Sequence, residues 1–151
     1  MDPKQVFENF RNNESDLTGE QISTFFDSLP DVHTDELIGN WRGGYFHFQH
    51  NEVAKQLDAV RWFGKSIISR DHAAPLVCLD EQNNPYTYQD IGEGVLRMVQ
   101  FRNGLTTALI YDQLPIIDYF RKVDSNTLLG IMEGKVYLEE NEFFYFFLER
   151  I

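Results

Sequence analysis

The pattern of apolar and polar residues has a period of two in the stretch 39–48 and again from Lys65 onward, which is the pattern of β-strands. In the stretch 39–48, alternation places Trp41, Tyr45 and His47 on one face of a strand. Glycines at 39, 43 and 44 carry no packing surface, and they suit a strand that must bend sharply. We therefore expect a bent strand at the start of a long antiparallel region.

The chain before this strand has a helical period instead. Apolar residues within 3–29 recur at spacings of three and four, and Thr18 and Gln21 have the spacing of a capping box. This pattern predicts amphipathic helices that cover one open end of the sheet. We expect a helical segment over residues 1–38 and a β-barrel over residues 39–151, within one structural domain.

A strong turn signal, Asn103-Gly104, separates two apolar runs within residues 95–111. Both residue types tolerate the positive φ of a two-residue hairpin, so the pattern predicts that Arg102 lies opposite Leu105. Both faces of this hairpin are largely apolar. One face should therefore pack on a core or a ligand, and the other should be covered by helix or loop.

The last apolar run, residues 143–148, would leave an exposed apolar edge if it did not pair. Pairing it with the first strand would remove both edges and close the sheet. We expect a mainly β fold, an antiparallel β-barrel of roughly eight to nine strands with N-terminal helices capping one end. Trp41 should pack at one end of this barrel, with Arg121 or Arg150 stacked on its ring.

Composition and charge limit the kinds of partner that we expect. The net charge of -11 and the pI near 4.6 would repel nucleic acid and anionic membranes. Cys78 is the only cysteine, so neither a disulfide framework nor a thiolate metal site is expected. No apolar run has the length of a signal peptide or membrane span. We expect a cytoplasmic monomer or homodimer without a metal or cofactor.

Several motifs resemble those of one protein family. They are Gly39-x-Trp41-x-Gly43, Trp62-x-Gly64-Lys65, and the block Tyr111-Asp112-x-x-Pro115-Ile116-Ile117-Asp118, which is the most specific. From about Leu37 to the C-terminus the chain resembles the GXWXG-domain family of bacterial proteins. The resemblance implies a calycin-like, lipocalin-like barrel that carries small hydrophobic molecules.

The apolar β region, with single polar residues within it, favours binding of one fatty acid or similar lipid inside the barrel over catalysis. Eight residues are expected to lie near this ligand: Trp41, Tyr45, His47, Trp62, Arg97, Tyr111, Asp118 and Phe120.

Three alternatives remain open. Asp112 or Asp118 would serve a small-molecule isomerase or cyclase as its acid or base, with Arg97 or Tyr111 assisting. The Gly-x-Trp-x-Gly opening also resembles haem-binding nitrobindins, in which a histidine would be the axial ligand. An exposed apolar patch would instead indicate a protein-interaction module. The pair His47 and His50 would face opposite sides of a strand, which argues against a metal site.

Overall fold

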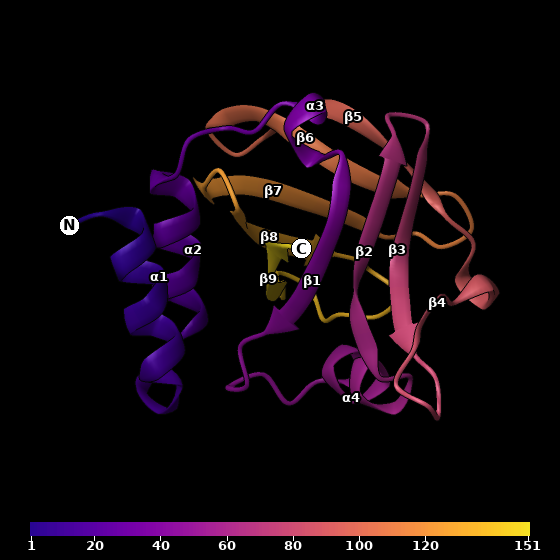
Figure 1. The fold of residues 1–151 in the computed structure, drawn as a ribbon. Coiled ribbons are helices and arrows are strands. Elements are labelled where there is room, and N and C mark those ends of the chain that lie inside the picture. Colours follow the sequence, from indigo (N-terminus) through magenta and orange to yellow (C-terminus); the bar gives the residue numbers. More distant parts are fainter.

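Nine strands form one antiparallel sheet in the computed structural model, which describes residues 1–151 (Figure 1). The strands are β1 (Gly39–Tyr45), β2 (Trp62–Ser69), β3 (His72–Leu79), β4 (Pro85–Thr87), β5 (Gly94–Phe101), β6 (Gly104–Tyr111), β7 (Ile117–Asp124), β8 (Thr127–Glu133) and β9 (Phe144–Arg150). Their order is β2-β1-β9-β8-β7-β6-β5-β3-β4, and an additional pairing of β2 with β3 closes the ring. The predicted mainly β, barrel-like fold is confirmed.

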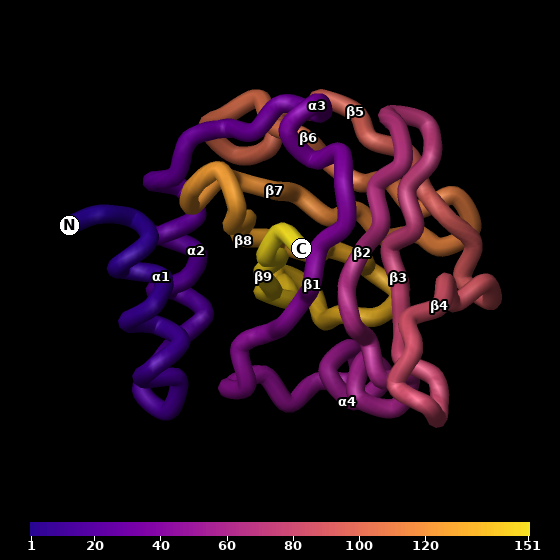
Figure 2. The backbone as a smooth tube through the Cα atoms, viewed as in Figure 1, coloured from indigo at the N-terminus to yellow at the C-terminus, as the bar shows by residue number.

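Closure depends on two kinds of contact. The last strand pairs with the first, as predicted, with Gly43 opposite Leu148 and Tyr45 opposite Phe146. The path of β1 between β9 and β2 is visible in the backbone trace (Figure 2). Between β3 and β5 the ladder is reduced to one pair, Ala73 with Gly94. The ring is therefore continuous but most weakly joined at this point.

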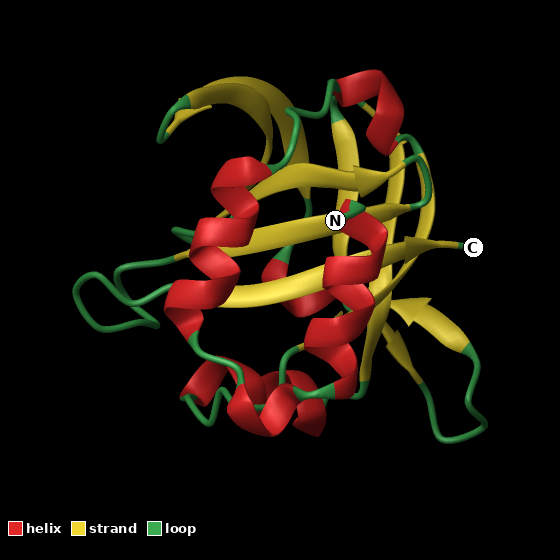
Figure 3. Ribbon diagram, turned by 90° about the vertical axis from the view of Figure 1, so that its left-hand side faces the viewer, coloured by secondary structure: helices red, strands yellow, loops and turns green.

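Two N-terminal helices, α1 (Pro3–Asn12) and α2 (Gly19–Ser28), lie side by side against the strands (Figure 3). The short 3-10 helix η1 (Glu14–Asp16) joins them. They cover the outer face of β6 to β9 and not the open end that the sequence pattern predicted, because the helix residues Phe7, Ile22 and Phe26 share a core with outward-facing residues of those strands. The predicted capping box is present: Thr18 Oγ1 accepts from the Gln21 N–H at 3.2 Å, and Gln21 Oε1 accepts from the Thr18 N–H at 2.9 Å.

Other helices close the two ends of the barrel. The short helix α3 (Thr34–Leu37) lies at one end of the barrel, and its residue Leu37 belongs to the interior core (Figure 1). At the other end lies α4 (Glu52–Ala59), which begins after Asn51, whose Oδ1 accepts from the Ala54 N–H at 3.1 Å. A second 3-10 helix, η2 (Gln89–Ile91), precedes β5.

The hairpin of β5 and β6 has a different register from the predicted one. Phe101 pairs with Gly104, so the two turn residues are Arg102 and Asn103, and Gln100 rather than Arg102 lies opposite Leu105. Arg102 has the positive φ, +58°. Gly104 begins the strand, and an ideal Cβ there would lie 2.6 Å from both Arg121 Nη2 and Asp31 Oδ1. Glycine is therefore needed at position 104 because there is no room for a side chain, and not because the turn requires a positive φ there.

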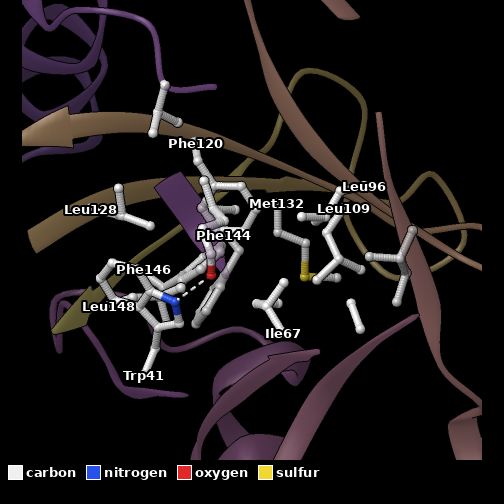
Figure 4. Packing of buried hydrophobic residues seen from close by; sticks show 14 of the residues in the cluster. Trp41, Ile67, Leu96, Leu109, Phe120, Leu128, Met132, Phe144, Phe146 and Leu148 are labelled. Carbon is white, nitrogen blue, oxygen red and sulfur yellow. Dashed lines mark hydrogen bonds between the residues drawn. The ribbon is translucent and has the colours of Figure 1, made fainter. Parts of the chain in front are cut away.

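Apolar side chains fill the barrel interior, as the close view shows (Figure 4). Trp41 is 1% exposed, and its Nε1 donates to the Leu37 carbonyl oxygen at 2.8 Å. The Arg150 guanidinium carbon lies 4.1 Å from the centre of the Trp41 ring. The predicted stacking of an arginine on Trp41 is confirmed for Arg150. Arg121 instead binds carbonyl groups at the end of α2.

Candidate functional site

A charged pair lies within the apolar barrel. Lys65 comes from β2 and Asp118 from β7, strands that are not neighbours in the sheet. The Lys65 Nζ lies 2.9 Å from Asp118 Oδ2, and the two side chains are 3% and 1% exposed. Taking two charges out of water is unfavourable, so they need close partners in the interior. The arrangement of those partners defines the site.

Tyr111, at the end of β6, is the third member of this cluster. Its hydroxyl donates to Asp118 Oδ2 at 3.0 Å and accepts from Lys65 Nζ at 3.3 Å. The Pro75 carbonyl oxygen accepts the remaining Lys65 hydrogen bond at 3.2 Å. Burial, and then the negative charge of Asp118, raise the pKa of Tyr111 well above its ordinary value. The phenol is therefore held neutral as a hydrogen-bond donor. We refer to Lys65, Tyr111 and Asp118 as the buried triad.

Aromatic rings surround the ammonium of the triad. The Lys65 Nζ lies 5.2 Å from the ring centre of Phe146, 5.6 Å from that of Trp62 and 5.7 Å from that of Tyr111. At these distances the negative face of a ring attracts a cation. The Trp62 ring is held in place because its Nε1 donates to the Gly64 carbonyl oxygen at 2.8 Å.

Beside the triad, a groove opens between the β6–β7 connection and the loop that joins β8 to β9. It has a volume of about 690 Å³. It is lined by Ile110, Tyr111, Leu114, Pro115, Ile116, Ile117, Glu133, Gly134, Lys135, Leu138, Glu139, Glu140, Asn141, Glu142 and Phe143. We call it the loop groove. Tyr111 belongs to both the groove wall and the triad, so it connects the surface with the buried charges.

Of the eight residues predicted near the ligand, three meet at the triad and two belong to the interior core. Trp62, Tyr111 and Asp118 meet at Lys65, as described above. Trp41 and Phe120 belong to the interior core, and the Phe120 ring lies 5.8 Å from that of Phe146. These two residues support the site through packing.

The other three residues point elsewhere. The Tyr45 ring packs against the core, but its hydroxyl donates to Asp58 Oδ1 at 2.8 Å; burial and then Asp58 raise its pKa to about 12. His47 lies on the exposed surface after β1. Arg97 faces outward and pairs with Asp71 at 2.9 Å. The structure does not bring His47 or Arg97 to the triad.

The two aspartates considered for catalysis have different surroundings. Asp112 is exposed, and its Oδ1 accepts from the Glu93 N–H at 3.0 Å, a structural contact that joins the residue before β5 to the residue after β6. Asp118 is buried, and its Oδ1 has no hydrogen-bond partner. Of the two, only Asp118 has the setting of a functional group.

Lys65 was not among the residues predicted near the ligand, although a signal was present. By alternation Lys65 shares a strand face with Ile67, and it pairs with Trp41 across β1 and β2. A lysine on a strand face that is otherwise apolar is rarely buried without a partner. The partner, Asp118, lies 53 residues further along the chain, and no local pattern links the two.

Metal and haem chemistry have little support in this arrangement. No group of three or more His, Cys, Asp and Glu side chains is placed to hold a metal ion. All four histidines lie on the exposed surface, so the barrel interior offers no imidazole to a haem iron. None of the helices has both the length and the apolar character needed to cross a membrane.

Comparisons with known proteins agree with this architecture. Residues 24–83 match the family model described as GXWXG protein, and residues 92–150 match the model described as Domain of unknown function (DUF4334). The crystal structure of a protein from Thermomonospora curvata is similar, with 32% sequence identity and a TM-score of 0.89. That match covers 100% of this chain and 99% of the other. No curated protein matches the sequence.

Proposed function

From the premise that this chain belongs to the GXWXG protein family, we propose that it binds a small amphipathic molecule in the loop groove. The apolar part of the ligand would lie against the groove wall and the polar part would point toward the buried triad. The observation that carries this proposal is the position of Tyr111, which lines the groove and hydrogen-bonds to Asp118.

The triad is hard to explain as a stabilising feature. A buried ion pair often contributes no more stability than apolar residues of similar volume, because desolvation offsets the attraction between the charges. The neighbours of Lys65 and Asp118 in the barrel are otherwise mostly apolar, so an apolar pair would continue the core. A tyrosine whose pKa is raised, placed beside a concavity as Tyr111 is, is typical of functional sites. This supports a binding role for the triad.

The loop groove has suitable dimensions and chemistry for such a ligand. Its volume of about 690 Å³ falls within the roughly 300 to 1,000 Å³ of typical small-molecule sites. Ile110, Leu114, Ile117 and Leu138 supply apolar surface along it. A pocket that combines apolar walls with a few polar groups both buries and orients its ligand.

Proton transfer is a second candidate function, and it uses the same cluster. Its support is the contact between the Tyr111 hydroxyl and Asp118, together with the unpartnered Asp118 Oδ1, which would accept a proton from a bound substrate. This makes Asp118, rather than Asp112, the residue to test in an isomerase reaction. The Asp118→Asn variant should then bind the molecule without converting it.

Binding can be tested with Nile red, a neutral apolar dye, and with native mass spectrometry of the purified protein. We expect one dye molecule per chain and displacement of the dye by any compound that co-purifies. Leu114→Trp places a large ring in the groove and should abolish dye binding without loss of folding.

The matched control is Leu105→Trp, at an exposed site (56% exposed) on the β5–β6 hairpin and outside the groove. This variant should bind the dye as the parent protein does. Equal binding by both tryptophan variants, or no dye binding by the parent, would contradict the proposed function.

A further inference from the structure

The buried triad has no free hydrogen-bond donor. A lysine ammonium has three hydrogens, and Lys65 Nζ has three acceptors within reach, at Asp118 Oδ2, Tyr111 Oη and the Pro75 carbonyl oxygen. The single hydroxyl hydrogen of Tyr111 is directed at Asp118 Oδ2. Every donor is thus occupied within the protein.

One acceptor in the triad remains open. Asp118 Oδ1 is buried, in a side chain that is 1% exposed, and it has no hydrogen-bond partner. A carboxylate oxygen without a donor is costly in an apolar interior. A molecule that reaches the triad through the Tyr111 wall therefore gains most if it supplies a hydrogen to this oxygen. A group that only accepts hydrogen bonds gains nothing there.

The charge of the loop groove also favours a ligand head that donates hydrogen bonds over an anionic head. Four glutamates, Glu133, Glu139, Glu140 and Glu142, line the groove, against one lysine, Lys135. The chain as a whole has a net charge of -11. The glutamates at the rim and the open carboxylate oxygen would both repel an anionic head, whereas neither would repel a neutral or cationic head.

We infer that the ligand is an apolar molecule with a hydrogen-bond-donating head, an alcohol or an amine, and that this head donates to Asp118 Oδ1. This inference rests on the proposed binding function and narrows it. It also revises the expectation of a fatty acid, since an ionised carboxylate head has no hydrogen to donate and carries the disfavoured charge.

The inference can be tested with four compounds that share one alkyl chain: dodecanol, dodecylamine, dodecyl methyl ether and dodecanoate. Each is titrated against the Nile red complex of the parent protein at pH 8. Dodecanol should bind about tenfold or more tightly than its methyl ether, because only the alcohol donates to a charged acceptor. Dodecylamine should also bind more tightly than the methyl ether, because its ammonium donates hydrogen bonds, and dodecanoate should be the weakest.

The outcomes separate the two proposals. If the methyl ether or dodecanoate binds as tightly as dodecanol, the inference is overturned while the binding function stands. If none of the four displaces the dye from a groove that binds it, the donor-head class is wrong. If Nile red itself does not bind in the groove, both proposals are wrong.

A substitution at Asp118 tests whether its carboxylate causes the preference for the alcohol over the ether. Asp118→Asn replaces the carboxylate with a neutral amide, and the preference for dodecanol over its methyl ether should fall to within about threefold. Asp112→Asn is the control, because its side-chain oxygen can still accept from the Glu93 N–H, and it should keep the parent preference. An unchanged preference in a folded Asp118→Asn variant would overturn the assignment. The four compounds on the parent protein decide the matter if that variant does not fold.

Discussion

The Trp62 ring occupies the space that a side chain at Gly43 would need. An ideal Cβ on Gly43 would lie 2.3 Å from Trp62 Cη2, far inside van der Waals contact. The same ring lies over the Lys65 ammonium, with 5.6 Å between Nζ and the ring centre. The second glycine of Gly-x-Trp-x-Gly therefore has a specific role: it makes room for an aromatic ring that covers the buried triad.

Gly43→Ala should destabilise the fold by about 1 to 3 kcal/mol, because the methyl group displaces a rigid ring in a packed site. Urea unfolding measures this change. Gly134→Ala is the control, since its Cβ would meet neighbours only at 3.4 Å. That variant should stay within about 0.5 kcal/mol of the parent. Equal stability of the two variants would show that Trp62 moves aside freely.

The Lys65 and Asp118 pair should show strong coupling in a double-mutant cycle. Lys65→Met or Asp118→Leu alone leaves one buried charge unpaired and should cost about 3 to 5 kcal/mol. The double variant should recover most of that loss, since both charges are removed together. Chemical denaturation of the four proteins gives the coupling energy.

A surface pair provides the comparison for this cycle. Arg97 and Asp71 lie 2.9 Å apart, with side chains 37% and 71% exposed. Arg97→Met should cost no more than about 1 kcal/mol, because water screens that pair. A coupling energy for Lys65 and Asp118 as small as that of an exposed pair would argue that water reaches the triad.

Arg121 should resist replacement by lysine. Its Nη1 donates to the carbonyl oxygens of Phe26, Asp27 and Leu29 at 3.0 to 3.3 Å, and its Nη2 donates to Asn103 Oδ1 at 3.1 Å. The Arg121 guanidinium thus links the end of α2 to the β5–β6 turn.

Lysine has a single ammonium and cannot reproduce the planar set of donors of the guanidinium. Arg121→Lys should therefore lower the free energy of unfolding by about 1 to 3 kcal/mol, measured by thermal or urea unfolding. Hydrogen exchange near the end of α2 should also become faster. The exposed Arg97→Lys should change stability by less than about 0.5 kcal/mol. Unchanged exchange in Arg121→Lys would show that the helix end is held by its apolar contacts alone.

Alkaline unfolding should depend on Tyr111. Burial and the charge of Asp118 raise its pKa in the folded state above the ordinary value of 10.0. Below pH 10 the phenol is neutral in both states and the stability is fully present. As the pH rises above 10, only the unfolded chain ionises, so the stability decreases. Tyr111→Phe should therefore lose stability less steeply above pH 10. Absorbance titration of tyrosinate combined with urea unfolding measures both effects, and identical slopes in the two proteins would contradict the assignment.

Much of the fold followed from local patterns. The period of two identified the strands, the capping box at Thr18 and Gln21 identified the start of α2, and the doubly apolar last strand predicted its pairing with β1. These features depend on residues that are close in sequence or on faces that must be buried. The hairpin turn lies one residue earlier than predicted, with Arg102 at positive φ, and Gly104 instead makes room for Arg121, a contact 17 positions away that no turn rule contains.

The sequence by itself determined that the chain would form a small closed antiparallel sheet with N-terminal helices, and it identified Tyr111 and Asp118 as polar residues in an apolar setting. Only the tertiary structure decided which polar groups meet. Lys65 and Asp118 come from strands that are not adjacent, and their contact depends on the curvature of a ring of strands. The same closure turns Arg97 outward to Asp71 and leaves Asp118 Oδ1 as the one open acceptor of the triad. Periodicity assigns a residue to a face, but the partner across a barrel is set by how all the strands pack together.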